Sequence, residues 1–223
     1  MYEFVFLDAD DTLLDFRKTE RAAITESFSR FGLEPTDALI ARYSAINQSC
    51  WERMERGEIT RDRVLIERFE RLFAETGADV DPYAFEDVYQ YRLGRWSFLV
   101  EGAAELLEYL RPKYKLYIAS NGVAATQDSR FRAAGLSPWF DAIFISERVG
   151  RHKPEKEYFD RCFAQIPGFR HDRAIIVGDS LSSDIQGGKN AGIDTCWLNI
   201  DKEPATHKPT YEISDISELK NIL

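Results

Sequence analysis

The sequence has no long hydrophobic run, no paired cysteines and no excess of basic residues. No apolar run approaches the roughly 20 residues needed to cross a bilayer, and the first residues lack the basic-then-apolar pattern of a signal peptide. Cys50, Cys162 and Cys196 are odd in number and scattered, with no C-x-x-C pair. They are expected to be free thiols in a reducing compartment. These features predict a cytoplasmic protein without a membrane partner.

The balance of charge restricts the class of ligand. A formal net charge of −9 argues against a nucleic acid polymer, because a phosphate backbone requires a basic face. A small phosphorylated molecule remains compatible, since one local cation can outweigh the overall sign. Apolar residues are abundant at 44%, with 15 Phe and 10 Tyr, so the 223 residues can bury a sizeable core. The sequence leaves open whether the protein is a monomer or a homodimer.

The most informative pattern lies at the start of the chain. Tyr2 and residues 4–7 form a short apolar run rich in aromatic and β-branched residues, too short for a helix, which predicts a strand buried on both faces. It is followed directly by Asp8-Ala9-Asp10-Asp11-Thr12. Two carboxylates about 4 Å apart repel by roughly 4 kcal/mol at an effective dielectric of 20. The cluster therefore predicts a cation or a reaction at the strand end, the alternative being a helix cap or a turn.

The rest of the chain divides into two patterns. Residues 16–98 show the apolar spacing of four successive helices with no strand between them, which predicts a separate helical bundle. From residue 99 onward, short apolar strands alternate with helices, which predicts a parallel sheet covered on both faces. We therefore expect an α/β core domain formed by residues 1–15 and 99–223, with residues 16–98 inserted as a separate helical domain.

Polar residues follow the predicted strands in a consistent way. In open α/β sheets, ligands bind beyond the carboxyl ends of the strands, so residues at these ends are expected to converge. Taken singly, each has an ordinary explanation as a turn, a helix cap or a surface lysine. Together they predict a phosphoryl-transfer site. They are Asp8 and Asp10 after the first strand, Ser120, Asn121 and Gly122 after the second, Lys153 in a loop, and Asp179, Ser180 and Asp184 after a later strand.

Phosphoryl transfer assigns a different task to each carboxylate. Asp8 is the expected nucleophile, able to form an aspartyl-phosphate. Asp10, two residues on, is the expected general acid and base, protonating the leaving oxygen and then deprotonating the hydrolytic water. Clustered negative charge is expected to favour the protonated form of Asp10, which would separate the roles of two neighbouring carboxylates.

The remaining polar positions are expected to bind phosphate and metal. Lys153, the Ser120 hydroxyl and the backbone N–H groups of residues 121–123, including Asn121 and Gly122, would hold the phosphate oxygens. Mg²⁺ suits an all-oxygen site, with Asp8, Asp179 and the backbone carbonyl of Asp10 as its expected protein ligands. Behind these groups, three residues are expected to give support: Thr12, Ser180 and Asp184.

These residues carry a family resemblance that covers the whole chain. The segments Asp8-x-Asp10-x-Thr12, Ser120, Lys153-Pro154 and Gly178-Asp179-Ser180-x-x-x-Asp184 resemble the four motifs of the haloacid dehalogenase-like hydrolases. The resemblance implies a Rossmann-like core with the first strand central, a helical cap inserted after the first motif, Asp8 as nucleophile and Mg²⁺ as cofactor. The aspartate at position 10 is similar to that of the phosphatases and mutases of the family.

A narrower resemblance points to a substrate. The segments Tyr43-x-x-x-Asn47-x-x-x-Trp51, Ile145-Ser146-Glu147 and Cys196-Trp197-Leu198-Asn199 resemble the bacterial pyrimidine 5′-nucleotidase branch, which implies activity on (deoxy)pyrimidine nucleoside monophosphates. Asn47 and Trp51 are four residues apart on one helical face, so the aromatic ring could stack on a base while the amide bonds its edge. The alternative is that Trp51 and Tyr43 only pack the cap.

Three other functions remain as alternatives. Within the same family, the chain could be a sugar-phosphate or phosphoglycolate-type phosphatase, or a phosphomutase that returns the phosphoryl group to a sugar. A receiver-type signalling module also combines acidic residues, a hydroxyl and a lysine on a flavodoxin-like sheet. The helical insert and Asp10 argue against a receiver, because Asp10 would hasten loss of the phosphate.

Overall fold

The computed structural model describes residues 1–205 and 207–223, which form two compact units. The first unit comprises Met1–Phe16 and Ser97–Leu223, and the second comprises Arg17–Trp96. These boundaries lie within two residues of those expected from the sequence. Among the described helices, none has the length and apolar character required to span a membrane.

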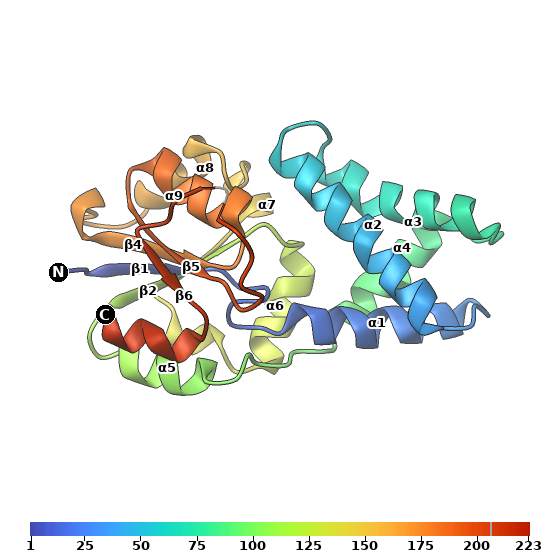
Figure 1. The fold of residues 1–223 in the computed structure, drawn as a ribbon, viewed down its shortest axis with the longest axis horizontal. Helices are drawn as coiled ribbons and strands as arrows, with labels where there is room; N and C mark the ends of the chain where they lie inside the picture. Colours follow the sequence, from blue (N-terminus) through green and yellow to red (C-terminus); the bar gives the residue numbers. More distant parts are fainter. Residues whose placement is uncertain (206) are drawn as a thin grey trace. The chain divides into compact units, whose positions relative to one another are not determined.

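The first unit is built on one parallel sheet of six strands (Figure 1). Its order is β3-β2-β1-β4-β5-β6, so the first strand lies in the interior of the sheet, as the resemblance implied. The Rossmann-like fold class is confirmed, because this is the strand order of a doubly wound α/β sheet. The strands are β1 Phe4–Leu7, β2 Lys115–Ser120, β3 Ala142–Ile145, β4 Ala174–Gly178, β5 Asp194–Leu198 and β6 Tyr211–Ile213.

Helices cover both faces of this sheet, which explains why β1 is apolar throughout. Val5 and Leu7 belong to the core on one face, and Phe4 and Phe6 to the core on the other. All four residues are fully buried. Two groups of elements form the outer layers: α5 Ala103–Leu110, α6 Ala124–Ala133 and the 3₁₀ turn Ile216–Asn221 on the first face, α8 Lys156–Phe163 and α9 Gln186–Ala191 on the second (Figure 1).

Strand register brings the polar strand ends together. Leu7, the last residue of β1, pairs with Ile118 of β2 and Val177 of β4. The residues that follow these strands therefore lie at one edge of the sheet. This edge is where an open α/β sheet binds its ligands.

One local element departs from regular α-helical geometry. After Ser180 the chain makes a π-helical turn, Leu181–Ile185, before α9 begins. The Ile185 N–H donates to the Ser180 carbonyl at 3.1 Å, five residues back. Wide turns of this kind occur often at functional sites. This one carries Asp184.

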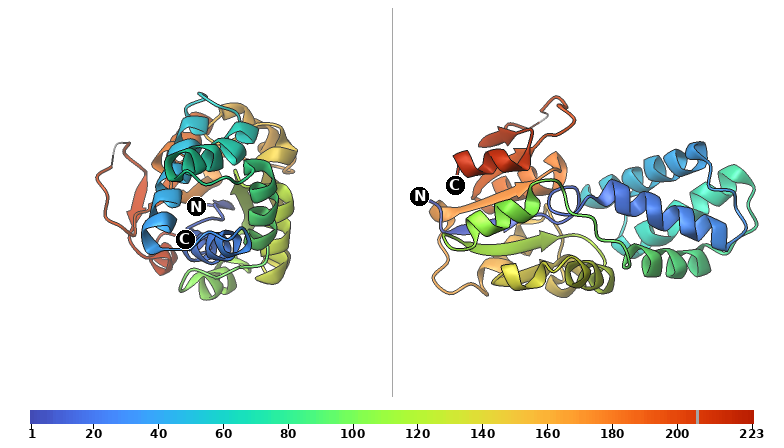
Figure 2. Two further views of the ribbon diagram at one scale, coloured as in Figure 1. Left: turned by 90° about the vertical axis from the view of Figure 1, so that its right-hand side faces the viewer. Right: turned by 90° about the horizontal axis from the view of Figure 1, so that it is seen from below.

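The second unit consists of four helices, seen from two directions in Figure 2. Three begin at side-chain caps: the oxygens of Thr36, Thr60 and Asp81 accept hydrogen bonds from backbone N–H groups in the first turn. Buried aromatic rings form the interior, with Tyr43 stacked on Phe69 at 5.3 Å. The helices are α1 Phe16–Arg30, α2 Asp37–Glu55, α3 Arg61–Thr76 and α4 Pro82–Leu93.

The segments leading into and out of the helical unit pair with each other. We call residues 13–15 and 98–100 the neck. The Asp15 N–H donates to the Phe98 carbonyl and the Val100 N–H to the Leu13 carbonyl, both at 2.9 Å. Leu14 and Leu99 form an antiparallel bridge between them.

Candidate active site

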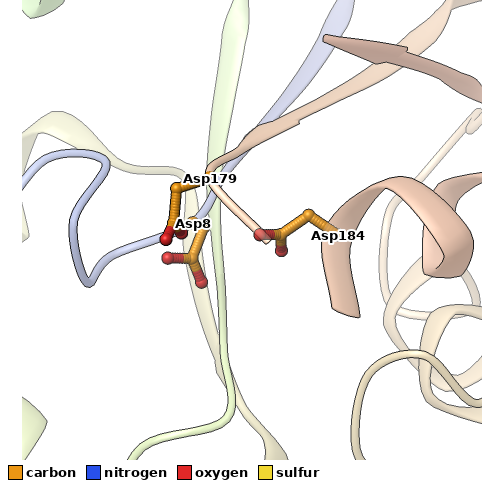
Figure 3. A group of neighbouring side chains, drawn as sticks. All are labelled: Asp8, Asp179 and Asp184. Atoms are coloured by element: carbon orange, nitrogen blue, oxygen red, sulfur yellow. The ribbon is translucent and has the colours of Figure 1, made fainter. Parts of the chain in front are cut away.

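Three carboxylates gather at the carboxyl edge of the sheet (Figure 3). Asp8 follows β1, Asp179 follows β4, and Asp184 lies on the π-helical turn. One oxygen of each lies within 4.8 Å of the others. In Figure 3, Asp8 and Asp179 lie side by side, and the Asp184 carboxylate points toward them from the turn. Gly178 permits this approach, because a Cβ atom there would lie 2.1 Å from the Asp184 Oδ2.

Lys153 places one cation against this group. Its side chain is buried, and its Nζ lies 2.5 Å from the Asp8 Oδ1 and 2.6 Å from the Asp184 Oδ1. Asn121 fixes the loop that carries the lysine: its Nδ2 donates to the Lys153 carbonyl and its Oδ1 accepts from the Lys153 N–H, both at 2.9 Å. The strand-end residue Asn121 therefore holds the backbone of the lysine.

Burial and mutual repulsion act strongly on these groups. Burial raises the pKa of Asp8 to about 8, the charges of Asp184 and Asp10 add to the rise, and Lys153 opposes it. Burial likewise raises the pKa of Asp179 well above its usual range, reinforced by Asp8 and Asp184. For Lys153, burial opposes the charged form, but Asp184 and Asp8 outweigh it and the pKa of the lysine is raised. The buried carboxylates thus carry more negative charge than Lys153 offsets.

The donor set fits a divalent cation that prefers oxygen. Carboxylate oxygens from Asp8, Asp179 and Asp184 are ligands of the type that Mg²⁺ takes, and a cation among them would offset charges that burial now penalises. Asp8 and Asp179 were expected from the sequence as ligands. Asp184 was expected only as support, yet it contributes to the same group, whereas the carboxylate of Asp10 lies outside it.

Asp10 belongs to a second network that the sequence analysis missed. Its Oδ2 accepts a hydrogen bond from the Gln127 Nε2 at 2.8 Å, and its Oδ1 forms an ion pair with Arg130. Clustered negative charge was expected to favour the protonated form of Asp10, and the structure also places a guanidinium against this carboxylate. Gln127 and Arg130 are three residues apart on α6, and that spacing on one helix face was the available signal.

Ser120 is held between this network and its own turn. Its buried Oγ accepts from the Gly122 N–H at 3.1 Å and from the Gln127 Nε2 at 2.9 Å. The Gly122 N–H, expected to contact phosphate, is therefore bonded to Ser120 instead. Because the Ser120 oxygen already accepts two hydrogen bonds, the hydroxyl can make a further one only by donating its hydrogen. That is the role a phosphate oxygen requires.

Two of the expected supporting residues lie beside the site. Ser180 caps the π-helical turn: its Oγ accepts from the Ser183 N–H at 3.1 Å, and its own N–H donates to the Asp184 Oδ2 at 3.2 Å. Ser180 thus fixes Asp184. Thr12 is fully buried in the turn after β1, and its hydroxyl has no hydrogen-bond partner among residues 1–205 and 207–223.

The two candidate residues of the helical unit lie in a polar network within that unit. Asn47 is buried; its Nδ2 donates to Glu20 at 2.8 Å, and its Oδ1 accepts from Arg68 at 2.9 Å and from the Trp51 indole N–H at 3.1 Å. Tyr43 packs in the aromatic core. Trp51 is partly exposed, and with its N–H engaged it offers its ring faces to a ligand.

Comparison with known proteins identifies the family. A family model described as haloacid dehalogenase-like hydrolase matches residues 2–192. The chain is a haloacid dehalogenase-like hydrolase. The expectation of an enzyme, and of a hydrolase in particular, is confirmed. The signalling-module alternative loses its basis, because the match covers strands β1 to β4, the helical unit and the site together.

Three relatives match this hydrolase over its full length. The crystal structure of the HAD-hydrolase YfnB from Bacillus subtilis bound to magnesium has a TM-score of 0.96 at 42% identity, covering 100% of this chain and 98% of that chain. The pyrimidine 5′-nucleotidase PynA of Streptococcus pneumoniae is 36% identical, covering 100% of this chain and 97% of its relative. The pyrimidine 5′-nucleotidase YjjG of Escherichia coli is 33% identical, with coverages of 100% and 98%.

Proposed function

We propose that this hydrolase is a Mg²⁺-dependent phosphomonoesterase that acts through an aspartyl-phosphate on Asp8, with (deoxy)pyrimidine nucleoside monophosphates as substrates. The observation that carries the proposal is the position of Asp8. Its carboxylate lies at the end of the buried β1 strand, 2.5 Å from the Lys153 Nζ and grouped with Asp179 and Asp184, while Asp10 stands in a separate network two residues on.

The first step transfers the phosphoryl group to the protein. An Asp8 oxygen attacks phosphorus, the bond to the leaving oxygen breaks, and Asp10 donates the proton that this oxygen needs. Lys153, already beside Asp8, offsets the negative charge on the phosphate oxygens, and the Ser120 O–H donates to one of them. When bound, Mg²⁺ held by Asp8, Asp179 and Asp184 would screen the charge of the phosphoryl group.

The second step returns Asp8 to its starting form. Asp10, now ionised, accepts a proton from water as that water attacks the aspartyl-phosphate. The bond between phosphorus and the Asp8 oxygen breaks and inorganic phosphate leaves. The side chain of Asp10 is 30% exposed, so water can reach its carboxylate.

The substrate class rests on the relatives and on the helical unit. Two relatives that match the whole chain at 36% and 33% identity are pyrimidine 5′-nucleotidases. The partly exposed Trp51 supplies an aromatic surface on which a base could stack. Both observations favour a nucleotide over a small sugar phosphate.

A phosphate-release assay with the full chain and Mg²⁺ tests the function. The panel contains dUMP, dTMP, CMP, AMP, glucose 6-phosphate and phosphoglycolate. We expect the pyrimidine nucleotides to be hydrolysed fastest, with activity lost on chelation and in the Asp8→Asn variant. Asp128→Asn is a matched control, since this carboxylate forms an exposed ion pair with Arg148 and should leave activity intact.

Each alternative has its own outcome in this assay. Full turnover by Asp8→Asn would overturn the aspartyl-phosphate mechanism. Equal rates for AMP and CMP would remove the pyrimidine preference and leave the phosphatase. An isomerised sugar phosphate without phosphate release would indicate a phosphomutase.

A further inference from the structure

Helix α6 carries two buried polar side chains for which packing alone gives no reason. Gln127 and Arg130 are each 1% exposed. Burying a guanidinium costs several kcal/mol unless it is well paired. Arg130 pairs through its Nη1 with Asp10 and with the Gln127 Oε1 at 2.9 Å, while its Nε and Nη2 have no hydrogen-bond partner in the described part of the chain. The arginine is thus directed at Asp10.

Gln127 links Asp10 to Ser120. Its Nε2 donates one hydrogen to the Asp10 Oδ2 at 2.8 Å and the other to the Ser120 Oγ at 2.9 Å, and its Oε1 accepts from Arg130. These contacts use both hydrogens of the amide and define which end is oxygen. Gly122 leaves room for this amide, because a Cβ atom there would lie 2.7 Å from the Gln127 Nε2.

The consequence for Asp10 is a fixed orientation. Arg130 holds one carboxylate oxygen and Gln127 holds the other, both from the same helix. A proton-transfer group must lie within hydrogen-bond reach of its target, and small misplacements are costly. The same glutamine also occupies a lone pair of the Ser120 hydroxyl, so that its hydrogen is free to donate.

We propose that Gln127 and Arg130 are positioning residues that hold Asp10 for proton transfer and set the Ser120 hydroxyl as a donor. The inference rests on the proposed function, since it assigns Asp10 the proton-transfer role. Neither residue needs to touch the substrate. Their contribution passes through Asp10 and Ser120.

The test compares two substrates that differ in their need for a proton. A nucleoside 5′-monophosphate releases an alkoxide, which requires protonation, whereas p-nitrophenyl phosphate releases a phenolate that departs without it. We expect Arg130→Met to lower kcat/KM for the nucleotide by about 10²-fold, a typical contribution of general acid catalysis. The value for p-nitrophenyl phosphate should change little. kcat/KM isolates transfer to Asp8 from the later hydrolysis.

A double-mutant cycle separates positioning from damage to the fold. In an Asp10→Asn background, Arg130→Met should cause no further loss for the nucleotide, because its effect passes through the missing carboxyl group. Arg148→Met, which breaks an exposed ion pair, is the matched control and should behave as wild type. If Arg130→Met fails to fold, Arg130→Gln makes the same comparison, because it removes the guanidinium and leaves the contact between Gln127 and Ser120 in place.

The outcomes distinguish this inference from the proposed function. Equal losses for both substrates, or additive losses in the Asp10→Asn background, would overturn the positioning role and leave the phosphatase intact. Absence of wild-type hydrolysis, or full activity of Asp8→Asn, would overturn the proposed function itself.

Discussion

Trp51 is the side chain on which recognition of a base by the helical unit would depend. Its indole N–H is engaged by Asn47, so the ring can offer its faces but not a hydrogen bond. Asn47 itself is buried, and its amide bonds to Glu20, Arg68 and Trp51. The structure therefore favours Asn47 as the residue that holds Trp51, and a base-edge contact by Asn47 remains only a sequence-based prediction.

Replacing Trp51 tests its role in binding. We expect Trp51→Ala to raise KM for dUMP by about 5- to 150-fold, since stacking of a base on an aromatic ring contributes about 1–3 kcal/mol. Trp51→Phe keeps a ring face and should stay near wild type. Glycerol phosphate, which has no base, serves as the control substrate, and steady-state kinetics gives the values. An unchanged KM for dUMP in Trp51→Ala would indicate that the ring only packs the unit.

At the scale of elements, one buried ion pair joins α3 to α4. The Arg68 Nη2 lies 2.6 Å from the Glu86 Oε2, and the two side chains are 2% and 8% exposed. The guanidinium also lies over the rings of Phe69 and Tyr89, 4.9 Å from each centroid. Removing one partner of such a pair leaves an uncompensated buried charge.

The stability of the helical unit should depend on both partners being present. We expect Arg68→Met to lower the free energy of unfolding by about 3–5 kcal/mol, measured by urea denaturation. Arg68→Met combined with Glu86→Gln should recover part of this loss, because the residue that faced the guanidinium then carries no charge. Arg42→Met removes an exposed pair with Glu75 between α2 and α3 and should cost at most about 1 kcal/mol. A small loss for Arg68→Met would show that Glu86 reaches water.

Much of the element pattern could be predicted from the sequence, because local signals and tertiary demands agree. The apolar run of β1 is buried on both faces, and the caps Thr36, Thr60 and Asp81 begin helices where side-chain oxygens can accept. The π-helical turn could not be predicted, since it depends on a contact between residues far apart in the sequence. In this contact the Asp184 carboxylate pairs with Lys153 and packs against the backbone of Gly178, where a Cβ atom would leave no room.

The residues of the candidate site likewise fall into those that the sequence could predict and those that it could not. Asp8 and Asp179 were predictable because they follow directly from buried strands, and strand ends converge by topology. Arg130 and Gln127 were not, since polar residues on a helix face usually meet water and periodicity cannot tell water from a buried carboxylate. These two side chains meet Asp10 only because of how α6 packs beside the turn that follows β1.

At the scale of the whole molecule, the surplus of buried negative charge should make Mg²⁺ a stabilising ligand. A ligand at 100 times its dissociation constant adds about 2.7 kcal/mol, which corresponds to roughly 5–10 °C in Tm for a chain of this size. Differential scanning fluorimetry with and without Mg²⁺ measures the shift. Because the pKa of Asp8 is raised to about 8, a proton competes with the cation, so the shift should be larger at pH 8 than at pH 6.

Two variants control this measurement. Asp179→Asn removes one member of the carboxylate group and should lose most of the shift, whereas Asp128→Asn should retain it. An equal shift in Asp179→Asn, or a shift that does not change with pH, would mean that Mg²⁺ binds elsewhere.

The neck bears on how such a molecule can diverge. Because residues 13–15 and 98–100 are hydrogen-bonded to each other, the insert begins and ends at adjacent points. A segment with neighbouring ends can be lengthened or exchanged at one local junction while the strand register stays as it is. The bundle can therefore change in length and sequence over evolutionary time while the groups at the edge of the sheet keep their positions.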